Sequence, residues 1–199
     1  MTNPENSQKI VKLSAENLAR AARDAGKKGL PPVHLWNPPD CGDIDMRIAR
    51  DGTWYYLGTP IGRPALVRLF STILRRDGDR YVLVTPVEKV GIVVDDAPFV
   101  AVDFNVEGAG ETQVLTFETN LGDVAVAGAD HPLRFVIDSE TNEPSPYVHI
   151  RGGLEALIDR KSFYRLVNIG SDQRIGDESW FGIRSSGVFF PICLTKALK

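Results

Sequence analysis

Two arginines, each next to glycine, precede a predicted helix and are candidates for anion binding. They lie in Gly62-Arg63-Pro64 and in Arg151-Gly152-Gly153. The amino end of a helix carries partial positive charge and unpaired N–H donors, so a cation there is mildly unfavourable unless an anion joins it. Glycine lets a ligand approach the backbone closely. The pattern indicates a phosphate or carboxylate site; the alternative is an exposed arginine, or one paired with a carboxylate such as Glu155.

A second set combines aromatic rings with charged side chains. Trp54 and Tyr56 lie on a predicted strand, and an aromatic face next to a cation can hold a planar ring by stacking. Alternate strand residues point to opposite faces, so only part of Trp54-Tyr55-Tyr56 shares one site, and core packing is the alternative. The candidate ligand-binding residues are Trp54, Tyr56, Arg63, Arg68, Glu88, Lys89, His149 and Arg151.

Other chemically capable residues lack a complete motif. The acidic pairs Asp43/Asp45 and Asp95/Asp96 have no histidine or third carboxylate close by, which favours solvated strand edges and turns over a metal site. The three histidines show no metal-ligand spacing. Nucleophile and phosphate-loop motifs are absent from the sequence. We therefore predict no catalytic residue, no metal ligand and no cofactor.

Several predicted elements must position the two arginines. Ser14 can cap a helix that runs to about Ala25, and a proline-rich connector follows it. From Ile44 apolar residues alternate, and Asp51-Gly52 is a strong signal for a hairpin turn. Pro64 suits the first position of a helix. An apolar face at helical spacing predicts that this helix continues to Arg76, before two strands at 81–85 and 87–94.

The second half reads as mostly strand. A meander is predicted at 99–106, 113–119 and 123–127, followed by strands at 133–138 and 147–150. A helix is predicted to begin at Leu154, with Ser162 capping a further helical turn; a strand over 163–169 is the alternative. The final hairpin joins 180–184 to 188–194.

These elements predict an α+β fold of two small, mostly antiparallel domains related by a duplicated ββαββ-like plan. The first copy runs from Ile44 to about Val94 and the second from about Leu133 to Ile192. The expected divisions are an N-terminal helical arm at 1–30, a first α+β domain at 31–96 and a second, β-rich domain at 97–199. Duplicated domains commonly create a cleft between them, where an anion would meet both arginines.

The composition is that of an ordinary globular protein. The chain has 199 residues, of which 43% are hydrophobic and 25% charged. A net charge of -3 argues against an extended nucleic-acid footprint. The first twenty residues are too charged for a signal peptide, and no apolar run approaches membrane-spanning length. With only Cys41 and Cys193, we expect a cytoplasmic protein with reduced thiols.

Several runs of residues resemble a bacterial family, the domain-of-unknown-function 1285 family. The runs are 41–48, 51–56, 58–63, 66–70, 83–89 and 94–99, with 185–189 as the best-fitting piece of the second half. The resemblance implies two domains with internal duplication and a second domain superficially like pleckstrin-homology folds. It implies no established activity. The resemblance also suggests a site at the domain interface, with a nucleotide-like ligand and a role in signal transduction.

Three functional hypotheses remain open on the sequence. The first is a non-enzymatic regulatory module that holds a small anionic, nucleotide-like ligand between the domains. The second is an enzyme that uses the same cleft, with Glu88 or Asp45 as the acid–base group. The third is an adaptor that binds a protein partner along a sheet edge of the second domain.

Overall fold

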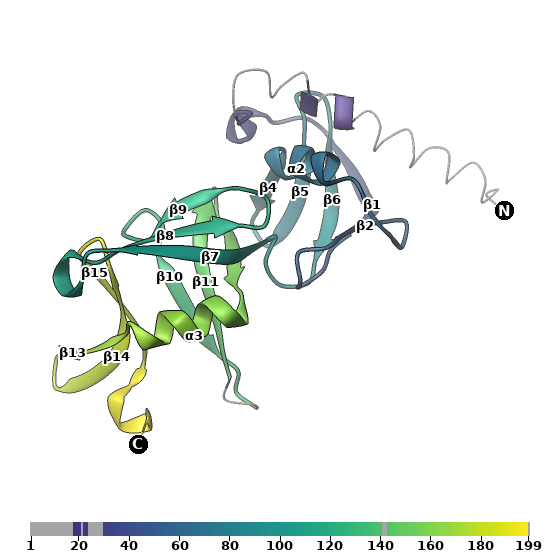
Figure 1. Ribbon diagram of the computed structural model, residues 1–199. Helices are drawn as coiled ribbons and strands as arrows, with labels where there is room; N and C mark the ends of the chain where they lie inside the picture. The colour runs from purple at the N-terminus through teal and green to yellow at the C-terminus, as the bar shows by residue number, and fades with distance from the viewer. Residues whose placement is uncertain (1–17, 21, 24–29, 141–142, 199) are drawn as a thin grey trace. The chain divides into compact units, whose positions relative to one another are not determined.

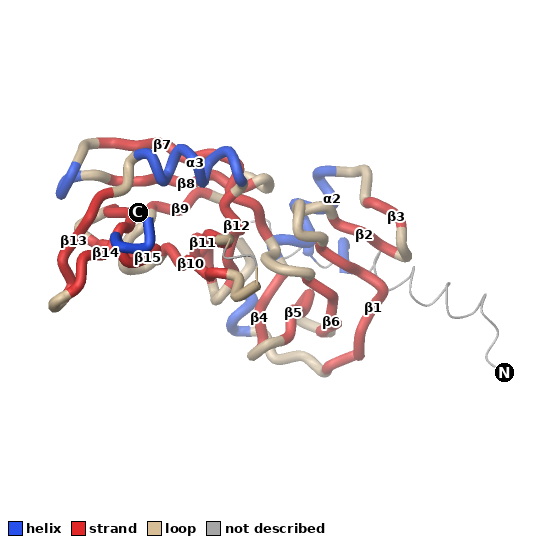
Figure 2. The backbone as a smooth tube through the Cα atoms, turned by 90° about the horizontal axis from the view of Figure 1, so that it is seen from below, coloured by secondary structure: helices blue, strands red, loops and turns tan. Residues whose placement is uncertain are grey.

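The computed structural model describes residues 18–20, 22–23, 30–140 and 143–198. The chain divides into two compact units, Met1–Asp96 and Ala97–Lys199. Strands dominate both units (Figure 1 and Figure 2). The predicted mostly-β α+β class with two domains is confirmed. None of the described helices is long and apolar enough to cross a membrane.

The first unit is built on one mixed sheet of six strands in the order β3-β2-β1-β6-β5-β4. Strands β1 and β6 pair in parallel, and the other neighbours are antiparallel. The elements are η2 (Val33–Leu35), β1 (Asp40–Ile48), β2 (Trp54–Tyr56), β3 (Thr59–Pro60), α2 (Pro64–Thr72), β4 (Leu74–Asp77), β5 (Arg80–Val84) and β6 (Lys89–Val94). Residues 18–20 and 22–23 are also helical, and the rest of the helix predicted from Ser14 to Ala25 lies outside the described residues.

The hairpin of β1 and β2 forms as the alternating pattern predicts. Met46 and Ile48 point inward and are buried, while Asp45 and Arg47 are exposed. Gly52 adopts a φ of 82° in the turn, a conformation that glycine allows at no steric cost. The Asp51 carboxylate accepts a hydrogen bond of 2.9 Å from the Thr53 N–H and closes the turn.

Helix α2 begins at Pro64 as predicted but ends earlier than its apolar pattern suggests. The helix stops at Thr72, and Leu74–Asp77 is strand β4. The prediction of helix to Arg76 is therefore wrong. Strand β4 pairs with β5, with Leu74 opposite Leu83, so inter-strand hydrogen bonds outweigh local helical spacing.

The second unit carries a six-stranded sheet in the order β10-β11-β12-β7-β8-β9, and β12 pairs with β7 in parallel. A smaller sheet has the order β13-β14-β15. The elements are β7 (Phe99–Glu107), η3 (Gly110–Thr112), β8 (Val114–Thr119), β9 (Val124–Val126), β10 (Leu133–Ile137), β11 (Pro144–Arg151), β12 (Leu154–Ile158), α3 (Arg160–Asn168), β13 (Ser171–Ile175), β14 (Glu178–Ser185), β15 (Val188–Leu194) and η4 (Thr195–Leu198). The meander and the final hairpin are confirmed; the pleckstrin-like form stays a prediction.

The two six-stranded sheets share one strand order, but in a different frame from the predicted duplication. When the strands of each sheet are numbered from its own first strand, both read 3-2-1-6-5-4, with strands 1 and 6 parallel. The second copy of this plan is therefore 99–158 rather than 133–192. The predicted frame was wrong because it aligned the two copies on their predicted helices. In the first unit a helix joins the third and fourth strands, whereas α3 follows the sixth strand of the second sheet.

The run that begins at Leu154 is a strand, which corrects the predicted helix. Gly152 and Gly153 have φ values of 53° and 76° and make a tight turn between β11 and β12. Every second residue of β12 is buried, which fits a strand paired on both sides. Helix α3 follows it, and the alternative of a strand over 163–169 is wrong. Its cap is Asp159, whose carboxylate accepts from the Ser162 N–H at 2.7 Å, rather than Ser162.

Ser185 ties the small sheet to the large one in the second unit. Its buried hydroxyl accepts a hydrogen bond of 2.9 Å from the Leu115 N–H and donates one of 2.7 Å to the Ala127 carbonyl. The Gln113 amide also donates to the Arg184 carbonyl at 2.6 Å. Since each of these bonds satisfies a backbone group between two sheets, they fix the final hairpin in place.

Candidate functional site

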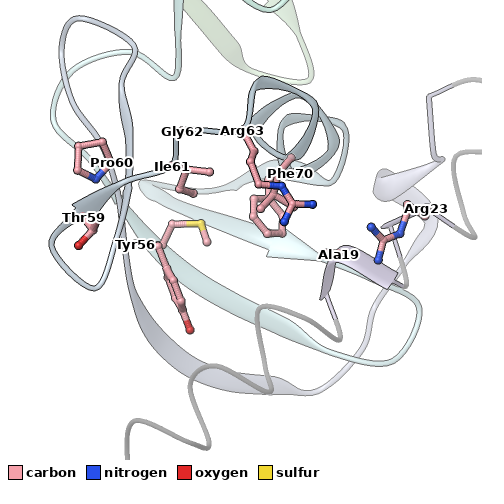
Figure 3. Close-up of a pocket in the computed structure, with 11 residues that line it drawn as sticks. Ala19, Arg23, Tyr56, Thr59, Pro60, Ile61, Gly62, Arg63 and Phe70 are labelled. Atoms are coloured by element: carbon pink, nitrogen blue, oxygen red, sulfur yellow. The ribbon is translucent and has the colours of Figure 1, made fainter.

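A pocket of about 460 Å³ lies within the first unit (Figure 3). This volume is within the range of pockets that hold small molecules. Among the described lining residues arginine is the only charged type, and the rest are apolar residues, glycine, one tyrosine and one threonine. The lining residues are Ala19, Arg23, Met46, Tyr56, Thr59, Pro60, Ile61, Gly62, Arg63, Leu66 and Phe70.

Four segments of the fold build the walls. Met46 on β1 and Tyr56 on β2 are register partners, so they stand side by side. The chain then turns back through Leu57 and Gly58, and the Ile61 N–H donates to the Trp54 carbonyl at 2.8 Å, which holds 59–63 against β2. Helix α2 supplies a third wall, and the helical residues at 18–20 and 22–23 supply a fourth.

Two cations define the electrostatics of the pocket. Arg63 is the N-cap residue of α2, and Arg23 belongs to the N-terminal helical residues. In the view of Figure 3 their guanidinium groups project toward each other beside Phe70. Among the described residues no carboxylate forms an ion pair with either arginine. Because the amino end of α2 adds partial positive charge, this side of the pocket favours an anion.

The pocket contains Tyr56 but not Trp54. Trp54 is 1% exposed and stacks on Phe70, with ring centroids 6.4 Å apart and planes 19° apart. Its indole N–H has no hydrogen-bond partner among the described atoms. Trp54 therefore packs in the core between the sheet and α2, and Tyr56 is the aromatic ring of the predicted pair that faces the pocket.

The remaining predicted residues of the first unit lie outside this lining. Arg68 is exposed on α2, and Glu88 precedes β6. Lys89 forms an ion pair of 3.0 Å with Asp77, which also accepts two hydrogen bonds from Arg75. The Arg75 hydrogen bonds, and then that from Lys89, lower the pKa of Asp77 to about 2 although burial opposes the shift. This cluster is structural, because Arg75 also binds two backbone carbonyls of the proline-rich connector.

The structure gives Arg151 and His149 structural partners in the second unit. Arg151 ends β11, so its predicted place at a helix start is wrong. It forms an ion pair with Asp123, and its guanidinium lies 4.9 Å from the centre of the Phe99 ring. His149 accepts a hydrogen bond from the Gly153 N–H at 3.2 Å, and its other ring nitrogen lies 3.1 Å from the Asp130 carbonyl oxygen. Neither residue lines the pocket of the first unit.

Asp43, Asp95 and Asp96 of the two acidic pairs form ion pairs with arginines. Asp43 shares Arg80 with Asp40, and both nitrogen–oxygen distances are 2.5 Å. The Arg47 guanidinium, 2.6 Å from Asp95, lowers the pKa of that carboxyl. Asp96 is similarly paired with Arg50. No cluster of metal-ligating side chains occurs within the described ranges.

Of the described residues that line this pocket, the sequence-based candidates included Arg63 and Tyr56 but not Arg23 or the apolar residues. Arg23 follows Ala19 by four residues, so both lie on one helical face, and this spacing was the available signal. Leu66 and Phe70 were predicted only as the buried face of α2, whereas they also line the pocket. No local sequence pattern predicts that residues 23 and 63 line one pocket, because this depends on the tertiary structure.

Comparisons with known proteins agree over nearly the whole chain. Residues 31–97 match the "Domain of unknown function (DUF1285), N-terminal domain", and residues 98–192 match the "Protein of unknown function (DUF1285), C-terminal domain". A DUF1285 protein from Silicibacter pomeroyi DSS-3 has 65% identity and a TM-score of 0.82, with 91% of this chain and 97% of that chain covered. A DUF1285 protein from Shewanella baltica OS155 has 32% identity and a TM-score of 0.49, with 62% and 90% covered.

The search of curated proteins found no match. Both solved relatives carry only the family designation, so they supply no ligand or reaction. The two matched domain models together span residues 31–192, and the Silicibacter pomeroyi relative, 65% identical, covers 91% of this chain. On these grounds the chain belongs to the DUF1285 family.

Proposed function

We propose that this protein is a non-enzymatic binding module that holds a small anionic ligand in the pocket of its first unit. One observation carries the proposal: a pocket of about 460 Å³ whose lining, among the described residues, contains two arginines and no acidic residue. Guanidinium groups form strong, directional hydrogen bonds with carboxylate and phosphate. In a partly enclosed site these bonds compete less with water than they do on an open surface.

The location supports binding more than catalysis. Glu88 and Asp45, the acid–base candidates considered from the sequence, do not line this pocket. Since Asp123 already neutralises Arg151, we assign Arg151 no ligand contact. The proposed site uses the first unit alone.

A regulatory role follows from which segments meet at the pocket. Arg63 belongs to the start of α2 and Arg23 to the N-terminal helical residues, so an anion held by both would join two separate segments. Ligand occupancy would then favour the docked arrangement of these segments over others. This coupling is the means by which the module would report the presence of its ligand.

The test is a thermal-shift screen of the whole chain against nucleotides, alkyl and aryl carboxylates, and simple anions. A ligand that binds only the native state raises the unfolding midpoint in proportion to dose. The Arg63→Gln variant should weaken binding about 10- to 100-fold, because a charge-assisted hydrogen bond contributes roughly 1.5–3 kcal/mol.

Arg68→Gln is the matched control, since Arg68 is an exposed arginine of the same helix that lies outside the lining. Its loss should leave binding unchanged. A screen in which no anion shifts the midpoint, or an equal loss in both variants, would contradict the proposal. In that case a protein-binding adaptor becomes the better hypothesis.

A further inference from the structure

We infer that the ligand of this pocket is an amphipathic acid: one anionic head on a hydrocarbon body, rather than a nucleotide. This inference rests on the proposed function, because it takes the two arginines as the site of the anion. It adds the chemistry of the rest of the ligand. Three features of the pocket carry it: the small number of polar side chains among its described lining residues, the packing of its aromatic rings, and its apolar lining.

The lining offers few groups that recognise a base or a sugar. Among the lining residues that the structure describes, the polar side chains besides the two arginines are the hydroxyls of Tyr56 and Thr59. No asparagine, glutamine, aspartate or glutamate occurs among these described lining residues. The edge of a base and the ribose hydroxyls need several donors and acceptors placed against them, and a buried polar group left unpaired lowers affinity. A hydrocarbon body makes no such demand.

The aromatic rings of the region are mostly committed to the core. Trp54 is 1% exposed and Phe70 is 2% exposed, and they stack on each other. Tyr56 is a half-buried ring in the lining. A base held between two aromatic faces therefore has no matching pair of surfaces within this lining.

Apolar side chains form the floor and walls instead. Ile61 and Leu66 are half-buried lining residues, so their side chains are available to contact a hydrocarbon chain. Met46 also belongs to the lining but is 1% exposed. Each methylene buried against such a surface should raise affinity about fourfold.

The arrangement thus has two parts with different recognition chemistry. Arg63 and Arg23 lie to one side and select negative charge, and the apolar walls beside them select hydrocarbon length. A carboxylate and a phosphate monoester both satisfy the arginines, so an alkyl carboxylate and an alkyl phosphate are the two sources to compare.

The test is isothermal titration calorimetry with the whole chain and three ligand series. The series are linear carboxylates from hexanoate to dodecanoate, alkyl phosphates of the same lengths, and the nucleotides AMP and GMP, all below their aggregation concentrations. We expect affinity to rise about fourfold per added methylene over the shorter members and then to level off when the pocket is full. The series with the higher affinity at equal chain length identifies the head group.

Two variants separate the head from the body. Arg63→Gln should lower the affinity of every chain length by a similar factor and leave the length dependence intact. Leu66→Gln should flatten the length dependence, and Leu66→Ala serves the same purpose if the polar variant melts early. Decanol is the uncharged control and should bind at least tenfold more weakly than decanoate.

The outcomes distinguish the inference from the proposed function. Nucleotide binding that depends on Arg63, without binding of any alkyl acid, would overturn the inference and leave the proposed function standing. Affinity independent of chain length would also overturn it. Absence of binding in all three series, or equal affinity for decanol and decanoate, would overturn both.

Discussion

Asp77 should stabilise the first unit through a cluster whose contribution depends on pH. Its carboxylate accepts hydrogen bonds of 2.6 and 2.9 Å from Arg75 and one of 3.0 Å from Lys89. Arg75 and Lys89 are only 15% and 18% exposed, so loss of the carboxylate charge leaves two cations poorly solvated. Asp77→Asn removes that charge with almost no change in volume.

The magnitude follows from the pKa of Asp77, which falls from 3.8 to about 2 on folding. A shift of this size corresponds to at most about 2.4 kcal/mol at neutral pH. Because the side chain is 30% exposed, we discount the effect for solvent screening and expect Asp77→Asn to lower the free energy of unfolding by about 1–2 kcal/mol.

The pH dependence has a definite sign. A carboxyl with a lowered folded-state pKa stabilises the fold above its unfolded pKa and loses that effect as the pH falls through its folded pKa. The difference between the unmodified protein and Asp77→Asn should therefore be constant from pH 7 to about pH 5. With the folded-state pKa of about 2, it should shrink to about half by pH 3.

Urea unfolding followed by circular dichroism at several pH values measures this difference. Asp79→Asn is the matched control, because Asp79 is fully exposed and its ion pair with Arg76 is long, at 3.8 Å. This substitution should leave the free energy of unfolding nearly unchanged, because exposed ion pairs contribute little to stability. A difference for Asp77→Asn that stays constant down to pH 3, or equals that of the control, would refute the reasoning.

Three further predictions concern the second unit. Ser185→Ala should lower the free energy of unfolding by about 3 kcal/mol in urea titrations, because it leaves a buried N–H and a buried carbonyl without their partner. A loss below about 1 kcal/mol would show that water replaces the hydroxyl. Gly170→Ala should cost about 1–3 kcal/mol by the same measurement, since its Cβ would meet the Phe181 ring, while Gly62→Ala, with open space around the added Cβ, should be near neutral. Burial raises the pKa of the Cys193 thiol, so alkylation followed by mass spectrometry should modify it more slowly than the exposed Cys41, and equal rates would contradict its burial.

The predictions from the sequence were correct where the local pattern agreed with the tertiary environment. Alternation from Ile44, the turn at Asp51-Gly52 and the helix start at Pro64 all formed as predicted. In each case the side-chain period and the backbone preference favour the same conformation, so tertiary contacts reinforce it. Arg63 was also identified locally, because its unusual place at a helix start is visible in the sequence.

The predictions failed where strand pairing or burial decided the outcome. The segments at 74–77 and 154–158 fit a helix locally, but hydrogen bonds to neighbouring strands made both of them strands. The frame of the duplication was wrong for the same reason, since strand order is a property of pairing between distant segments. Helix and strand are hard to distinguish in short apolar runs.

By itself, the sequence determined the family resemblance, the mostly-β class, and candidate residues for anion binding. Only the tertiary structure decided which of these residues share a pocket. It buried Trp54 under α2, paired Arg151 with Asp123, and placed Arg23 and Arg63 in the lining of one pocket. The physical reason is that a side chain's charge and shape are local, whereas its exposure and its partners depend on segments far away in the chain.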